Sequence, residues 1–388
     1  MPHFYDLDEA ATKFVKMATT VAIETAQPAA ADVDARGRVP EESLAVLAAA
    51  GLFGLCLPPD VGGKGQGPNV FCAVVEELAQ ACASTAMIYV MHTAAAQIIA
   101  ASPTLASKQD LLKQIALGKH LTTLAFSERG SRSEFWAPVS RLEAQGSDYV
   151  TSGFKSWVTS ASRADSYVSS AQTPGAASPV ESVLYLVRKG TAGVTVGPAF
   201  NGLGLRGNDS SSVTLENVKV PKADLISELG KGMDLMMGVC LPWFNIGSAA
   251  MANGLCRAAI DVTAAHLQNA GFEHRRSQLR ELPNLRARIA AMSVRTEQAR
   301  ALLGHTLREM VRPTDRTTLY VLQTRLASVQ AAADVTELAM NTCGGVAFSK
   351  GLPLERMFRD ARAGWVMAPT VDHLEDFSGR ALTGMPLF

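Results

Sequence analysis

The chain has 388 residues, of which 47% are hydrophobic and 19% charged, and a chain of this size supports several packed layers around large buried cores. Basic and acidic residues balance at 36 each, which argues against nucleic acid or an acidic membrane surface as a partner. Residues 1–11 mix acidic and apolar residues without a basic-then-apolar signal pattern, so we expect a cytoplasmic protein.

Two uncharged stretches, residues 78–107 and 235–256, are long enough to cross a membrane. Polar residues such as His92 and Asn245 interrupt both, so we interpret them as buried core helices and expect no membrane partner. The cysteines form no CxxC pair and no Cys/His cluster, which predicts reduced core residues and no metal site. The six are Cys56, Cys72, Cys82, Cys240, Cys256 and Cys343.

Helical periodicity dominates residues 1–120 and predicts an N-terminal helical domain. A proline at position 40 and a glycine at position 51 predict a short helix between them. Residues 69–83 form a second amphipathic run, with Glu76 and Glu77 expected on its polar side. Ser107 and Asp110 resemble a capping box in front of the next apolar segment.

Short alternating segments replace the helical pattern over residues 121–228 and predict an antiparallel β domain. The turn residues 145–148 predict a hairpin, and residues 183–187 and 212–220 are further strands.

Helical periodicity then returns over residues 229–388 and is typical of a four-helix bundle. The long helices are expected at residues 233–268, 284–312 and 319–341. The predicted fold class is therefore α+β, with a helical, a β and a second helical domain in that order.

This order and a series of motifs resemble the acyl-CoA dehydrogenase superfamily over nearly the whole chain. Residues 57–65 (LPPDVGGKG) are similar to a glycine-rich loop of that family. Residues 125–134 (AFSERGSRSE) resemble the loop that lies along the flavin ring, with arginines at positions 129 and 132 where the family has proline and glycine. Residues 153–160 (GFKSWVTS) resemble a strand whose tryptophan packs on that ring, and residues 341–370 resemble the C-terminal motif.

The resemblance implies FAD as cofactor, or FMN or a reduced flavin supplied by a reductase partner, and a homotetramer. Trp157 and Thr159 are expected to point the same way along a strand toward the flavin. The glycine pair at 344 and 345 would approach the cofactor of a neighbouring subunit, and Arg275 or Arg276 would loosely match the family's pyrophosphate arginine. The implied flavin contacts are Phe126, Ser127, Ser133, Trp157, Thr159, Arg275, Arg276, Asn341, Gly344, Gly345 and Thr370.

The residue that carries the family's reaction is absent. Ala368 occupies the position where the family usually has a glutamate that removes the substrate α-proton. Some members place that base on the first helix of the C-terminal domain, next to a substrate-binding arginine, but here Phe244 and Asn245 hold those two positions. Nearby carboxylates at positions 134, 372, 375 and 376 are more simply explained as solvated charges.

His92 and Ser133 are the candidate catalytic residues. His92 lies in a helical segment that the family places near the substrate cavity, and histidine is the usual proton donor near neutral pH. A lone histidine in an apolar helix is more often a hydrogen-bonded core residue, and this interpretation stays slightly ahead. Ser133 keeps a hydroxyl on the flavin loop.

These features favour a flavin monooxygenase that uses reduced flavin and O₂ on a small, non-CoA substrate, because that chemistry needs no α-carbon base. An aromatic substrate is suggested by residues that could line a pocket, namely Phe135, Trp136, Trp243, Phe244 and Trp365. Two alternatives stay open. One is an enzyme of the acyl-CoA dehydrogenase type with a displaced base or a base-free reaction. The other is a catalytically silent subunit that supports a partner chain.

Overall fold

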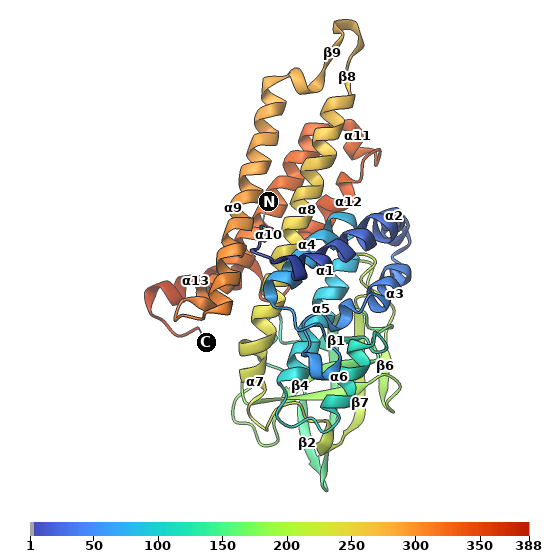
Figure 1. Ribbon diagram of the computed structural model, residues 1–388. Coiled ribbons are helices and arrows are strands. Elements are labelled where there is room, and N and C mark those ends of the chain that lie inside the picture. The colour runs from blue at the N-terminus through green and yellow to red at the C-terminus, as the bar shows by residue number, and fades with distance from the viewer. Residues whose placement is uncertain (1–3, 388) are drawn as a thin grey trace.

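The computed structural model describes residues 4–387 and shows two helical regions, which precede and follow a β-sheet in the chain (Figure 1). The sheet lies at one end of the molecule, and the long C-terminal helices extend from it toward the other end (Figure 1). The N-terminal helices are α1 (Glu9–Val21), α2 (Gln27–Arg36), α3 (Glu41–Ala49), α4 (Pro68–Ala81), α5 (Ala83–Ala101) and α6 (Lys108–Ala116). The predicted α+β fold with this order of regions is confirmed.

Local signals set the ends of the N-terminal helices. Pro40 is the N-cap of α3, and Gly51 follows that helix with a left-handed φ of 70°, so the helix predicted between them is confirmed. Ser107 precedes α6 but makes no side-chain cap, which corrects the predicted capping box. Its hydroxyl instead accepts a hydrogen bond from Arg188 at 3.0 Å.

Seven strands form the central sheet, with the path β1-β4-β2-β3-β7-β6 and β5 paired to β4. They are β1 (Thr122–Ala125), β2 (Arg141–Gln145), β3 (Asp148–Val158), β4 (Ser166–Gln172), β5 (Ser182–Arg188), β6 (Val194–Val196) and β7 (Ser211–Val220). The predicted hairpin is confirmed, because Gln145 pairs with Asp148 across a two-residue turn. The sheet is not wholly antiparallel as predicted, since β1 and β4 run parallel.

Three long helices dominate the C-terminal region (Figure 1). A continuous helical segment begins at Gly232, with a short π-helical stretch between α7 and α8. The elements are α7 (Gly232–Leu235), α8 (Leu241–Asn269), β8 (Gly271–Phe272), β9 (Ser277–Gln278), α9 (Pro283–Val311), α10 (Thr317–Cys343), α11 (Gly345–Phe348), α12 (Leu354–Val366) and α13 (Val371–Thr383).

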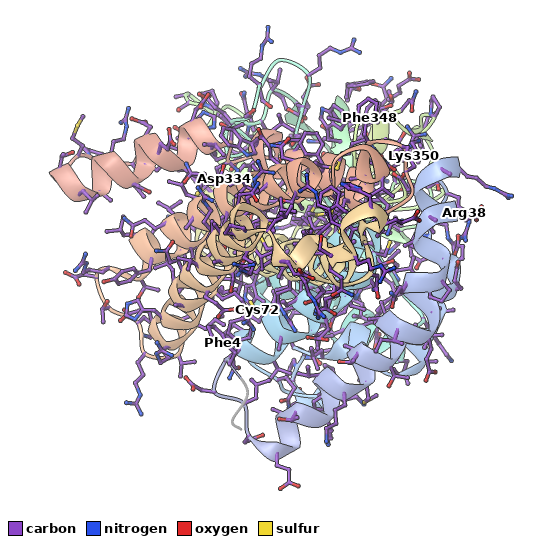
Figure 2. All side chains as sticks on the ribbon, turned by 90° about the horizontal axis from the view of Figure 1, so that it is seen from above. Phe4, Arg38, Cys72, Asp334, Phe348 and Lys350 are labelled. Carbon is purple, nitrogen blue, oxygen red and sulfur yellow. The ribbon has the colours of Figure 1, made fainter. Side chains whose placement is uncertain are left out.

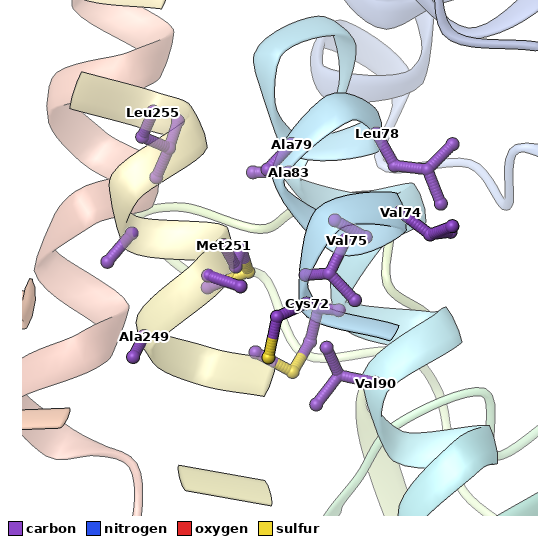
Figure 3. Close-up of a cluster of buried hydrophobic side chains, with 14 of the residues drawn as sticks. Cys72, Val74, Val75, Leu78, Ala79, Ala83, Val90, Ala249, Met251 and Leu255 are labelled. Atoms are coloured by element: carbon purple, nitrogen blue, oxygen red, sulfur yellow. The ribbon is translucent and has the colours of Figure 1, made fainter. Parts of the chain in front are cut away.

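Small residues allow α8 to pack closely on α4. A Cβ atom built at Gly254 would lie 2.5 Å from the Glu76 carbonyl oxygen, so only glycine fits at this crossing. Figure 3 shows the apolar layer between the two helices, in which Cys72 and Val75 face Met251. The close approach ties the N-terminal helices to the C-terminal ones and makes one continuous core.

Glu76 is buried at this contact, which corrects its predicted place on a polar face. Arg257 contacts its Oε1 at 2.8 Å and Arg300 at 3.0 Å, and the Tyr5 hydroxyl donates to its Oε2. The carboxylate is thus matched by two cations, as a buried charge requires.

Two helices of the described chain are apolar and long enough to span a membrane by length and composition, α5 and the continuous helix Gly232–Asn269. The most apolar windows of the two are 83% and 61% buried inside the protein, as predicted for core helices. All six cysteines are free thiols, and five of them are buried as core residues.

Candidate flavin site and its missing base

A buried ion pair fixes the loop that the sequence assigns to the flavin. Lys155, on β3, places its Nζ 2.7 Å from Oε1 of Glu128, on the loop after β1. Both side chains are almost completely buried, and Glu128 also accepts hydrogen bonds from the backbone N–H groups of Val139 and Ser140. Burial alone would raise the pKa of Glu128, but Lys155 and these donors outweigh it and hold that pKa below its ordinary value.

Trp157 presents its ring to solvent beside this loop. It lies at an irregularity where β3 loses register with β7, and it has a left-handed φ of 56°. A bulky residue rarely adopts this conformation, and such strain is often found at functional positions. Trp157 is 62% exposed, and its ring packs on Phe200 with the ring centroids 4.5 Å apart. A large aromatic ring held in this exposed way fits a planar ligand.

Hydroxyl groups lie on the same two segments. Ser127 accepts a backbone hydrogen bond from Ser156 at 2.8 Å, which joins the loop to β3. Within residues 4–387, the hydroxyls of Ser127, Ser133 and Thr159 make no hydrogen bond, so these groups are available to a ligand. Thr159 is buried whereas Trp157 is exposed, so the two side chains have different surroundings, and their common direction toward the flavin stays a prediction. The irregularity in β3 breaks the simple alternation.

The start of α13 packs against the far side of the flavin loop. Phe126 is buried and stacks on Phe135, whose neighbour Trp136 contacts His373 edge-on at a centroid distance of 5.4 Å. Thr370 is the N-cap of α13, and its hydroxyl accepts a hydrogen bond from the His373 N–H. The fold therefore brings Thr370 toward the loop that carries Ser127 and Ser133.

The remaining predicted flavin contacts lie far from this cluster. Arg275 ends the short turn between β8 and β9 and Arg276 follows it, at the tip of the molecule opposite the sheet (Figure 1). Asn341 lies at the C-terminal end of α10. Gly344 follows α10 with φ 60° and ψ −134°, a conformation open to glycine, and a Cβ there or at Gly345 would meet open space.

No carboxylate stands at either base position. Ala368 is half-buried and its methyl group packs against an apolar cluster, while Asn245 is fully buried on α8. The nearby acids are used elsewhere or face solvent: Asp376 pairs with Arg380, and Glu375 accepts a hydrogen bond from Gln330. Asp372 and Glu134 are exposed.

A buried arginine occupies the space between these two positions. Arg325, on α10, donates from Nη2 to the carbonyl oxygen of Met367 at 2.7 Å and from Nη1 to Oδ1 of Asn245 at 3.2 Å. Its guanidinium lies 4.7 Å from the centroid of the Phe244 ring. Burial lowers its pKa to about 9. The sequence gives little warning of this group, because one arginine in an amphipathic helix is usually a solvated charge.

His92 is a core residue in this structure. Its Nδ1 accepts a hydrogen bond from the Thr122 N–H at 3.2 Å and its Nε2 lies 3.3 Å from the Phe53 carbonyl oxygen, which requires the neutral ring with hydrogen on Nε2. Burial lowers its pKa to about 4. Both nitrogens are engaged by the backbone, so this arrangement favours the core interpretation over the catalytic one.

Several other sequence-based interpretations need revision. The aromatic residues do not form one wall: Trp243 packs on Phe71, whereas Trp365 is 42% exposed on α12. Arg129 stacks on Phe154, with its guanidinium 4.4 Å from the ring centroid. Arg359 pairs with Asp34 and Glu355. The neighbouring Asp360 accepts a hydrogen bond from the Leu205 N–H at 2.6 Å.

Comparison with known proteins settles the family. The acyl-CoA dehydrogenase N-terminal, middle and C-terminal domain models match residues 8–119, 123–218 and 230–369. The chain belongs to the acyl-CoA dehydrogenase superfamily. It is 29% identical over 338 residues to the mitochondrial short-chain specific acyl-CoA dehydrogenase of Bos taurus, an alignment that covers 86% of this chain and 81% of that one.

Solved structures share the fold. Butyryl-CoA dehydrogenase from Megasphaera elsdenii superposes with a TM-score of 0.92 at 23% identity, covering 97% of this chain and 99% of that one. An FAD-dependent dehydrogenase superposes with a TM-score of 0.88 at 22% identity, covering 97% and 98% of the two chains. The FAD predicted as cofactor agrees with this family of flavin-dependent oxidoreductases.

Proposed function

We propose that this protein is an FAD-dependent oxidoreductase of the dehydrogenase type that acts on a small acyl substrate without the family's glutamate base. The observation that carries the proposal is the exposed Trp157 beside a loop on which the Ser127 and Ser133 hydroxyls make no hydrogen bond to residues 4–387, in a chain related to acyl-CoA dehydrogenases over most of its length. These relatives favour the dehydrogenase type over the monooxygenase type.

The chain's own residues would bind and orient the cofactor. Trp157 would pack on its ring system, while Ser127 and Ser133 would hydrogen-bond its polar edge. The pair of Glu128 and Lys155 holds their loop in place before the ligand arrives. Bound FAD would accept the electron pair that leaves the substrate.

Removal of a substrate proton would differ from the usual family reaction. Positions 245 and 368 carry an amide and a methyl group, which cannot act as a base. A proton would therefore leave to solvent or to a group on the substrate itself. We expect slow turnover of ordinary saturated acyl-CoA compounds for this reason.

We also propose a homotetramer. Arg275, Arg276 and the glycine pair 344–345 lie too far along the molecule to join the Trp157 cluster of their own chain (Figure 1). Phe348 is 84% exposed just after that glycine pair, and Figure 2 shows it next to Lys350 on the outside of the helices. A neighbouring copy would cover this apolar ring and use these groups. Light scattering should give a tetramer, and a monomer at micromolar concentration with flavin bound would contradict it.

A monooxygenase remains the second candidate, because the same absence of a base suits a reaction between reduced flavin and O₂. The two candidates differ in their need for oxygen. Purified protein loaded with FAD is mixed with saturated acyl-CoA compounds of increasing chain length in the absence of O₂. Loss of the flavin's visible absorbance supports the dehydrogenase type. Oxygenated product formed only from reduced flavin and O₂ would support the monooxygenase type instead.

The same preparation tests whether the chain is an enzyme at all. FAD titration, followed by flavin fluorescence, should show saturable binding, whereas no binding at micromolar concentrations would overturn both candidates. Flavin binding with no reaction under either condition would favour the silent subunit.

A further inference from the structure

Arg325 is a buried cation without a counter-ion. Its side chain is completely buried in the middle of α10, and no carboxylate among residues 4–387 forms an ion pair with it. A guanidinium has five N–H donors, but within the described residues only Asn245 and the Met367 carbonyl accept from Arg325, and its Nε has no partner there. Glu76 and Lys155, two other strongly buried ions, each have an opposite charge within 3.0 Å.

This imbalance points to a missing anion. A buried charge is normally paired, and an isolated one destabilises the folded chain. Burial lowers the pKa of Arg325 to about 9, and among residues 4–387 no carboxylate forms an ion pair that would offset this effect. A guanidinium presents a rigid planar fork of donors, and the ligand group that matches it best is a carboxylate.

The position of the guanidinium links it to the reacting end of the site. Met367, whose carbonyl it binds, directly precedes Ala368, and Asn245 holds the second position at which the family places a base. Trp243 and Ala368 are only partly buried and pack against the same apolar cluster as Leu326, the residue next to Arg325. The cation is therefore buried next to the place where the family's glutamate is absent, in a region that contains partly buried side chains.

We infer that Arg325, with the Asn245 amide beside it, forms a subsite for a carboxylate carried by the substrate. This inference rests on the proposed function for the entry of a small acyl substrate, and it adds a substrate class. The preferred compound carries a free carboxylate and is not an uncharged fatty acyl chain. The anion that the protein lacks at positions 368 and 245 is then supplied by the ligand.

Binding of simple carboxylates tests this subsite without any turnover. Acetate, butyrate and benzoate are added to the purified full chain, with and without FAD, at constant ionic strength maintained with chloride. Thermal unfolding is followed for each, and the corresponding neutral amides serve as matched ligands. At least one carboxylate should raise the unfolding midpoint in a saturable way, while its amide should not.

Three variants make the result specific. Arg325→Met should weaken carboxylate binding roughly 10- to 100-fold, the loss expected for hydrogen bonds to a charged group. Arg325→Lys keeps the positive charge but loses the planar pair of N–H donors. Its affinity for carboxylates should therefore lie between those of the wild type and Arg325→Met. Arg359→Met removes an arginine that is already paired with Asp34 and Glu355, so it should bind carboxylates like the wild type.

The stability of the empty protein gives a second readout. If the Arg325 charge is paired only when a ligand binds, Arg325→Met removes an unpaired buried charge from the empty protein. The variant should then unfold at the same temperature as the ligand-free wild type or at a higher one. Equal responses to carboxylate and amide, or equal carboxylate binding by Arg325→Met, would overturn the subsite. Failure to bind FAD would overturn only the proposed function, because the carboxylate response of the FAD-free chain is measured separately.

Discussion

Lys155→Met should destabilise the protein and weaken flavin binding together. The Lys155 ammonium is fully buried and contacts Glu128 Oε1 at 2.7 Å and the Ser170 carbonyl oxygen at 2.5 Å. Methionine fills the space of the lysine stem but leaves the Glu128 carboxylate buried without its cation. Breaking a buried pair in this way costs about 3–5 kcal/mol of unfolding free energy.

The loss of the buried ion pair should also weaken FAD binding, because Glu128 belongs to the loop that carries Ser127 and Ser133. Unfolding by urea and FAD titration by fluorescence measure the two effects on the same preparation. The double variant Glu128→Gln/Lys155→Met removes both charges and should recover part of the stability lost by either single variant.

An exposed ion pair supplies the control. Arg380→Met disrupts the surface pair with Asp376 and should change stability by less than about 1 kcal/mol. A Lys155→Met variant that is equally mild, or that binds FAD as tightly as the wild type, would refute the role assigned to the buried pair.

Three further predictions follow from the same structure. The buried neutral His92 has a folded pKa of about 4, below the ordinary 6.5, so its contribution to stability is complete above pH 6.5. About 3 kcal/mol should be lost as the pH falls from 6.5 to 4, and His92→Gln should remove that part of the pH dependence in urea unfolding. Equal pH profiles for the two proteins would show that His92 titrates freely. Trp157→Ala should weaken FAD binding by about 2 kcal/mol, or roughly 30-fold in Kd, while Trp157→Phe should retain most of the affinity; unchanged Kd in the alanine variant would remove Trp157 from the site. Gly344→Val should shift the assembly toward smaller species in light scattering, because its φ of 60° and ψ of −134° disfavour a branched side chain, and an unchanged tetramer would contradict a role at the interface.

The features that could be predicted from the sequence are those set by residues close together in the chain. Pro40 and Gly51 limit α3 through their own backbone preferences, and the turn at residues 145–148 sets the β2–β3 pairing by itself. Parallel pairing of β1 with β4 joins segments about 40 residues apart, so no local pattern reports it. The order of the strands in the sheet could therefore not be predicted from the sequence, whereas the order of the helical and β regions could.

The site was predictable only in part for the same reason. Trp157 was found through a motif, but its left-handed backbone and exposed ring depend on the irregular pairing of β3 with β7. His92 looks reactive in the sequence until the backbone groups of Phe53 and Thr122 are seen to engage both nitrogens. Arg325 appears as an ordinary helix charge, and only tertiary packing reveals that it is buried without a partner.

This flavin-dependent protein lacks a base at the position where its family removes a proton, and flavin reduction tests that absence most directly. Anaerobic stopped-flow mixing with butyryl-CoA compares the rate of flavin reduction in the wild type and in Ala368→Glu. We expect slow reduction of the wild type and a rate at least about 100-fold higher in the variant, which is the usual contribution of a positioned base. Wild-type reduction as fast as that of Ala368→Glu would contradict the account, because the chain would then possess a base that Ala368 and Asn245 do not provide.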